Sequence, residues 1–202
     1  MRSKSNIFLC PNPNGDWPQV DSTAYIDPTA QIIGKIDIGA KVFVGPNAVI
    51  RADETDDNGN VSPIEIGPEC NVQDGVIIHA LGGTKVTVGQ RTSLGHGCII
   101  HGPCTLGDGC FVGFGAKVFD AILGDGVFVG TGAVIQGVKL DSKSLVPSTV
   151  SVLCREHMVR FVSTTSLTES EFMEKVVAAN LNLAKGYIGL KKKEVDTYGD
   201  KS

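Results

Sequence analysis

Large aliphatic residues recur every six positions through most of the chain. Between Ile26 and Val146, nineteen positions hold Ile, Val or Leu at this spacing, with longer gaps after Ile50 and Ile78 and two steps of five near the end. An amphipathic helix would need apolar residues three or four apart, and a half-buried strand would need them two apart. A period of six instead indicates a solenoid of short strands, in which each repeat packs on its neighbours.

Two residues before each large aliphatic residue lies a small or β-branched one, from Ala24 to Ser144. Four of the six cysteines occupy this second set, so we expect them to fill the core rather than form disulfides or bind metal. One large and one small inward residue in six is typical of a hexapeptide β-helix. We therefore predict an all-β solenoid, a parallel β-helix of about six triangular coils over residues 21–150. Its left-handed sense is what similarity to hexapeptide-repeat proteins implies.

The segments outside the repeat differ in character. Residues 1–20 are expected to be an N-terminal extension, and residues 191–202 a polar tail. Residues 151–190 combine a connector with a C-terminal α-helix, whose start is indicated by a capping box formed by Thr168 and Glu171. The helix carries one predicted apolar stripe, formed by Phe172, Val176, Ala179, Leu183 and Tyr187.

The residue that follows each large aliphatic one lies where the chain turns a corner of the triangle. Counting repeats in threes sorts these positions into three columns, and two of the columns hold all nine glycines found there. The third column has no glycine and places Arg51, His79 and His101 on successive coils. His79 and His101 are 22 residues apart, which is one coil plus a four-residue insertion. Their rings are therefore expected about one strand spacing apart, at ~4.8 Å, close enough to share a metal ion.

His96 falls in a glycine column, one edge away from this pair. The five residues from His96 to His101 span roughly 16 Å when extended, whereas metal–nitrogen bonds are ~2.0–2.1 Å long, so one chain cannot bring all three rings to one metal. A second copy can, if the His79 edge of one subunit faces the His96 edge of the next. Such a head-to-tail contact closes naturally as a three-fold ring, which predicts a homotrimer with a metal ion at each interface. Arg51, Asp53 and Asp74 could equally form salt bridges across that interface.

Charge and hydropathy narrow the possible partners. The net charge is −4 and the first basic run is KKK at 191–193, which argues against binding to nucleic acid. No apolar stretch approaches the roughly 20 residues of a membrane span. The apolar patch near the N-terminus is too short for a signal peptide. We therefore expect a cytoplasmic protein that binds neither nucleic acid nor membrane.

Three motifs carry a family resemblance. RADE (51–54), NVQDGVIIH (71–79) and HGCIIHGPC (96–104), in this order on hexapeptide coils, closely resemble the γ-class carbonic anhydrases. The resemblance covers about residues 17 to 190 and is closest to the short, signal-less methanoarchaeal branch and to the N-terminal domain of a carboxysome shell-associated protein. It implies a lyase that reversibly hydrates CO2 to bicarbonate by a metal-bound hydroxide at trimer interfaces. The implied metal is Zn2+, or Fe2+ in vivo, with one ion per interface.

The same resemblance assigns roles to residues that match the motifs. The metal ligands would be His79, His96 and His101, the first and third from one subunit and the second from its neighbour. Gln73 would orient the metal-bound water or hydroxide. Asn71, Asp74 and Glu54 would belong to the active-site network. Arg51 and Asn180 would help to hold bicarbonate and the interface. Asp53 would pair with Arg51.

The loop after His79, HALGGTKVTVG, contains no acidic residue, whereas the best-known family member has a longer acidic loop there with a glutamate proton shuttle. Regeneration of the hydroxide needs a proton carrier. Either Glu54 alone serves, or turnover is slower, or buffer reaches the site directly. One alternative function is therefore a catalytically weak metal-binding structural or assembly subunit. Another is a hexapeptide acyltransferase, for which a single histidine would suffice as general base.

Overall fold

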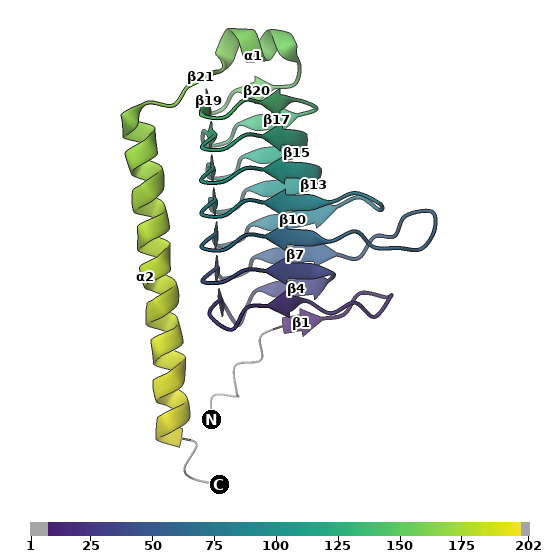
Figure 1. Cartoon of the computed structure of the whole chain (residues 1–202), viewed down its shortest axis with the longest axis vertical. Coiled ribbons are helices and arrows are strands. Elements are labelled where there is room, and N and C mark those ends of the chain that lie inside the picture. Colours follow the sequence, from purple (N-terminus) through teal and green to yellow (C-terminus); the bar gives the residue numbers. More distant parts are fainter. Residues whose placement is uncertain (1–7, 199–202) are drawn as a thin grey trace.

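The computed structural model describes residues 8–198, with side chains as far as Leu190. The chain winds into a parallel β-helix of triangular cross-section, and a long helix runs beside it (Figure 1). This confirms the predicted solenoid. The helices are α1 (Arg155–Phe161) and α2 (Leu167–Tyr198), and none of the described helices is long and apolar enough to cross a membrane.

Three strand stacks form the faces of the triangle. Face 1 consists of β1 (Phe8–Cys10), β4 (Gln31–Gly34), β7 (Val49–Ala52), β10 (Ile77–Ala80), the first parts of β13 (Ile99–Leu106) and β15 (Lys117–Leu123), β17 (Val134–Gln136) and β20 (Ser151–Val152). Face 2 consists of β2 (Gln19–Val20), β5 (Ile36–Ile38), β8 (Ile64–Ile66), β11 (Val86–Val88), the second parts of β13 and β15, and β18 (Lys139–Leu140). Face 3 consists of β3 (Tyr25–Ile26), β6 (Phe43–Val44), β9 (Asn71–Val72), β12 (Ser93–Leu94), β14 (Phe111–Val112), β16 (Phe128–Val129) and β19 (Ser144–Val146), to which β21 (Ser163–Thr164) adds an antiparallel strand.

The periodic residues form the core, as the spacing predicts. Ile50, Ile78 and Ile100 stack on successive coils and are completely buried. The four cysteines of the second set are buried, and all six cysteines are free. Burial raises the pKa of Cys70 and Cys98 to about 12, so these thiols stay protonated at neutral pH and act as core filler.

The boundaries of the solenoid differ from the sequence prediction, whereas the coil count agrees with it. The seven parallel strands of face 3, from β3 to β19, enclose six coils. The expected extension, residues 1–20, includes β1 and β2, which pair with β4 and β5, and β20 lies beyond the expected end at residue 150. Leu9 and Val20 pack against the core, but the intervening loop breaks the six-residue period and hides them from a pattern search.

Helix α2 also departs from the prediction in three respects. It extends to Tyr198, eight residues past the expected boundary at 190. Its N-terminal capping box is formed by Ser166 and Glu169 rather than by Thr168 and Glu171, since the Ser166 N–H donates to Glu169 Oε2 at 2.8 Å. The side chains buried against the solenoid lie about one position beyond the predicted stripe, and they are those of Met173, Val177, Asn180 and Ala184.

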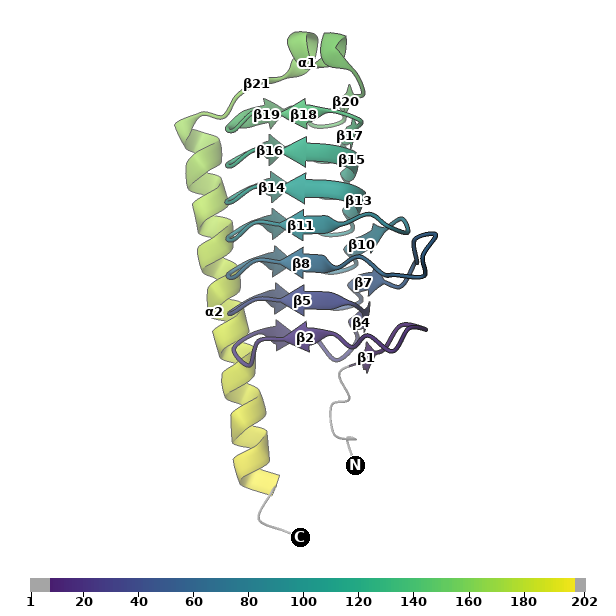
Figure 2. The ribbon, with the colours of Figure 1, turned by 45° about the vertical axis from the view of Figure 1, so that its right-hand side comes forward.

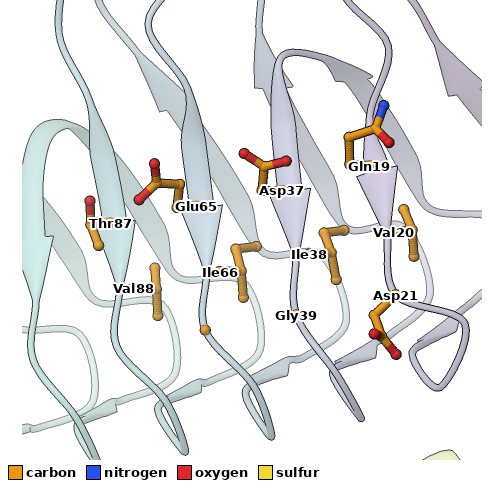
Figure 3. Close-up of a pocket in the computed structure, with 11 residues that line it drawn as sticks. Gln19, Val20, Asp21, Asp37, Ile38, Gly39, Glu65, Ile66, Thr87 and Val88 are labelled. Atoms are coloured by element: carbon orange, nitrogen blue, oxygen red, sulfur yellow. The ribbon is translucent and has the colours of Figure 1, made fainter.

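The three faces have different outward side chains. Face 3 presents aromatic rings that α2 covers: Tyr187 stacks on Tyr25 with centroids 4.8 Å apart, and Phe172 contacts Phe111 at 5.1 Å. Face 2 is polar, and Figure 3 shows Asp37, Glu65 and Thr87 in a row across its strands. Face 1 presents a row of incompletely buried aliphatic residues, Val49, Ile77 and Ile99, which the exposed Lys117 separates from Val134. Both helices lie away from β7, β10 and β13 (Figures 1 and 2).

Glycine marks the two edges where one coil passes closest to the next. A Cβ on Gly107 would lie 2.7 Å from the backbone nitrogen of Asp125 on the following coil, which leaves no room for a side chain. The third edge, between faces 1 and 2, has no such glycine column. It carries the β1–β2 loop and two inserted loops, residues 53–63 and 81–85. We call it the loop edge, and we call the edge between faces 3 and 1 the His96 edge.

Candidate metal centre

The loop edge brings His79 and His101 together. They are register partners in β10 and β13, as the repeat count predicts. His79 Nδ1 lies 3.2 Å from His101 Nε2. Two nitrogen atoms bound tetrahedrally to one zinc ion at ~2.0–2.1 Å lie about 3.3 Å apart, so these two atoms are placed to share a metal.

The outer nitrogen of each ring faces an acceptor. His79 Nε2 is buried and lies 3.4 Å from Asp53 Oδ1 and 3.5 Å from Glu54 Oε1. His101 Nδ1 lies 3.0 Å from the carbonyl oxygen of Gly102. Metal-binding histidines commonly donate their second N–H to a carboxylate or a carbonyl, which fixes the tautomer and leaves the inner nitrogen free for the metal. The surroundings of both rings therefore suit metal binding.

Further side chains of the loop edge flank this pair. Arg51 is the register partner of His79 on the preceding coil, and its guanidinium lies 3.1 Å from Asp53 Oδ2. On the following coil, the Phe119 ring meets His101 at a centroid distance of 5.4 Å. The edge is thus polar on one side of the histidine pair and aromatic on the other.

His96 lies one edge away from the histidine pair, together with Gln73 and Asp74, which were also predicted as site residues. Its backbone N–H donates to Gln73 Oε1 at 3.2 Å, and its Nδ1 is 3.6 Å from Asp74 Oδ2. Phe114 follows on the next coil, 46% exposed, with its ring centroid 5.4 Å from that of His96. Among the side chains that the structure describes, no group of three His, Cys, Asp or Glu residues could hold a metal ion within one chain.

Asn71 and Asn180 lie between face 3 and α2. Asn71 is fully buried, and neither atom of its amide has a hydrogen-bond partner among the described residues. Its register partner Ser93 is also buried, and the Ser93 hydroxyl is likewise unpaired in the described part of the chain. Asn180, 8% exposed, donates to the carbonyl of Val176. The aromatic cover of face 3 is thus interrupted by a polar region on the coils that carry the histidines.

Sequence reasoning assigned no role to Gly82 or Phe119. The N–H of Gly82 donates to Glu54 Oε2 at 3.2 Å, joining the two inserted loops. Phe119 stands in the glycine-free column, so its position beside His101 was available from the repeat count. For the contact of Gly82 with Glu54, the only signal in the sequence was the pair of adjacent glycines in HALGGTKVTVG.

Comparison with known proteins shows hexapeptide repeats throughout the second half of the solenoid. The family described as bacterial transferase hexapeptide (six repeats) matches residues 85–119, and the hexapeptide repeat of succinyl-transferase matches residues 121–153. A solved structure, a hexapeptide transferase family protein from Anaplasma phagocytophilum, is similar with a TM-score of 0.75 and 29% identity over 90% of this chain and 98% of that one.

Two curated relatives resemble a larger part of the sequence. The carbonic anhydrase of Methanosarcina thermophila is 34% identical over 196 residues, which cover 87% of this chain and 77% of the relative. The carboxysome assembly protein CcmM of Nostoc sp. is 33% identical over 180 residues, covering 84% of this chain but only 31% of that longer protein.

Proposed function

The chain belongs to the γ-class carbonic anhydrase family, and on that premise we propose that it reversibly hydrates CO2 to bicarbonate at metal sites shared between subunits of a homotrimer. The observation that carries the proposal is the approach of His79 Nδ1 to His101 Nε2, 3.2 Å apart, with Asp53 and Glu54 behind His79. This arrangement is what two ligands of one metal need.

The third ligand in this proposal is His96 of a neighbouring subunit. His96 is half exposed on its own edge, and Phe114 beside it is an exposed aromatic ring. The row of aliphatic side chains on face 1 supports the same contact, since face 1 lies between the loop edge and the His96 edge. Contiguous exposed apolar surface commonly marks a protein interface. Face 2 is polar and face 3 is covered by α2, so face 1 is the face best suited to association.

Three neutral imidazoles suit zinc and iron(II) alike. When bound, the metal would lower the pKa of a water molecule toward neutrality, as is well established for zinc carbonic anhydrases. Gln73, next to His96, would orient the attacking oxygen. Arg51 is cationic and partly exposed beside His79, so it would bind the bicarbonate anion. By lowering the pKa of the water, the metal would supply a hydroxide able to add to the carbon of CO2 and give bicarbonate, and the proton lost by the water would pass to buffer.

A direct test is stopped-flow CO2 hydration by protein purified without air and loaded with zinc or iron(II). We expect a rate above that of buffer which His101→Ala abolishes, and a trimer by sedimentation. Metal-replete trimers with no rate above buffer would overturn the catalytic proposal. A monomer of normal metal content would overturn the shared site.

One observation favours a second function. The loop of residues 81–85 offers no acidic side chain for proton transfer, and CcmM, a relative of this chain, is named as a carboxysome assembly protein. Metal-bound trimers without hydration activity would favour a structural or assembly role. Acetyl-CoA turnover without CO2 hydration would instead favour an acyltransferase, in line with the transferase-family fold.

A further inference from the structure

Two inserted loops project side by side from the loop edge (Figures 1 and 2). Residues 53–63 connect β7 to β8, and residues 81–85 connect β10 to β11. The loops meet without space between them: a Cβ on Gly82 would lie 2.0 Å from the carbonyl oxygen of Thr55. Position 82 therefore excludes every side chain as long as the loops keep this contact.

The contact has a chemical link to the histidine pair. The Gly82 N–H donates to Glu54 Oε2 at 3.2 Å, and the other oxygen of that carboxylate, Oε1, lies 3.5 Å from His79 Nε2. Glu54 thus lies between the backbone of one loop and the outer nitrogen of His79. Its side chain is about half exposed, so without the Gly82 hydrogen bond it would be free to turn into solvent.

We propose that Gly82 is a positioning residue for the metal centre. Its missing side chain lets the loops close, and its N–H holds the Glu54 carboxylate behind His79, which orients the imidazole so that Nδ1 faces the metal. This inference rests on the proposed metal site, and it gives the acid-free loop a function in metal binding. Partners behind a metal-binding histidine typically change metal affinity by about 10–100-fold when removed.

The test is zinc affinity of the full-length protein, measured by chelator competition. We expect Gly82→Ala to weaken binding by about tenfold or more while trimers persist. Glu54→Ala should cause a similar loss, and the double variant should lose no more than either single variant, because both break the same link. Gly186→Ala is the control: Gly186 lies in α2 with open space around its Cβ position and no left-handed φ, so it should retain wild-type affinity.

Independent, multiplying losses in the double variant would overturn the proposal, as would unchanged affinity in Gly82→Ala. If Gly82→Ala does not fold, Glu54→Gln decides: its single amide oxygen can accept from the Gly82 N–H or from His79 Nε2–H but not from both, so it should lose about as much affinity as Glu54→Ala. Wild-type affinity in Glu54→Gln would contradict the link. Zinc binding that follows this pattern in a protein without CO2 hydration would overturn the catalytic function alone, whereas a wild-type protein that does not bind zinc would overturn both.

Discussion

Pairs of histidine variants are expected to complement each other according to the edge on which each histidine lies. His79 and His101 lie on the loop edge of one chain, with nitrogen atoms 3.2 Å apart, and His96 lies on a different edge. A shared site takes two ligands from one subunit and the third from the next. Mixing His96→Ala with His101→Ala therefore rebuilds a site wherever the intact His96 of one variant meets the intact loop edge of the other.

The size of the effect follows from the ring. In trimers assembled at random from equal amounts of the two variants, about one quarter of the interfaces combine the right neighbours, so metal content and activity should reach about a quarter of wild type. Among purified mixed trimers the fraction is about one third, because each such ring contains one correct neighbour pair. Mixing His79→Ala with His101→Ala rebuilds none, since both ligands come from the same chain.

The assay needs trimers that demonstrably contain both variants. Two affinity tags and sequential purification select them, and metal analysis with CO2 hydration measures the restored sites. His79→Ala mixed with His101→Ala is the matched control, with the same number of missing imidazoles. Equal metal content in the two mixtures, or none in either, would refute a site shared between subunits.

Further predictions concern stability and thiol chemistry. Gly107→Ala should destabilise the solenoid by about 1–3 kcal/mol in urea unfolding, because its Cβ collides with the next coil, whereas Gly186→Ala in α2 should be neutral or stabilising. Phe172→Ala should lower the free energy of unfolding by about 2 kcal/mol, because the ring is 42% exposed and loses only its contacts with face 3. The variant should also make α2 more susceptible to limited proteolysis. At pH 8 a thiol reagent should label only two of the six cysteines rapidly in the folded protein. Burial raises the pKa of the other four to about 11 or 12, and these are Cys70, Cys98, Cys104 and Cys110. Fast labelling of more than two cysteines would contradict this prediction.

The solenoid was predictable because its repeat is local. Every six residues return the chain to an inward position, so the register of His79 with His101 follows from counting and is observed. The six-residue pattern could not predict the segments that lie outside the repeat. The strand Phe8–Cys10 stands outside the repeat, and α2 continues to Tyr198 on polar residues that have no apolar stripe.

The candidate site divides in the same way. The histidine pair and Arg51 occupy periodic positions, and the three-column count places them on one edge. Contacts of Glu54 with His79 and Gly82 depend on two irregular loops that share no period, so their meeting is decided by tertiary packing. The site of Asn180 against face 3 likewise depends on the rotation of α2, which the predicted stripe placed about one residue away from the observed one.

The length of α2 relates the helix to the number of coils. Phe172 contacts rings on β14 and β16, and Tyr187 contacts a ring on β3. The two residues are fifteen positions apart, which corresponds to about 22 Å of helix at ~1.5 Å per residue, and four to five strand spacings of ~4.8 Å span about 19–24 Å. If one coil were gained or lost, the helix would have to gain or lose about three residues to keep both aromatic contacts. Two distant segments of the sequence can change length only together.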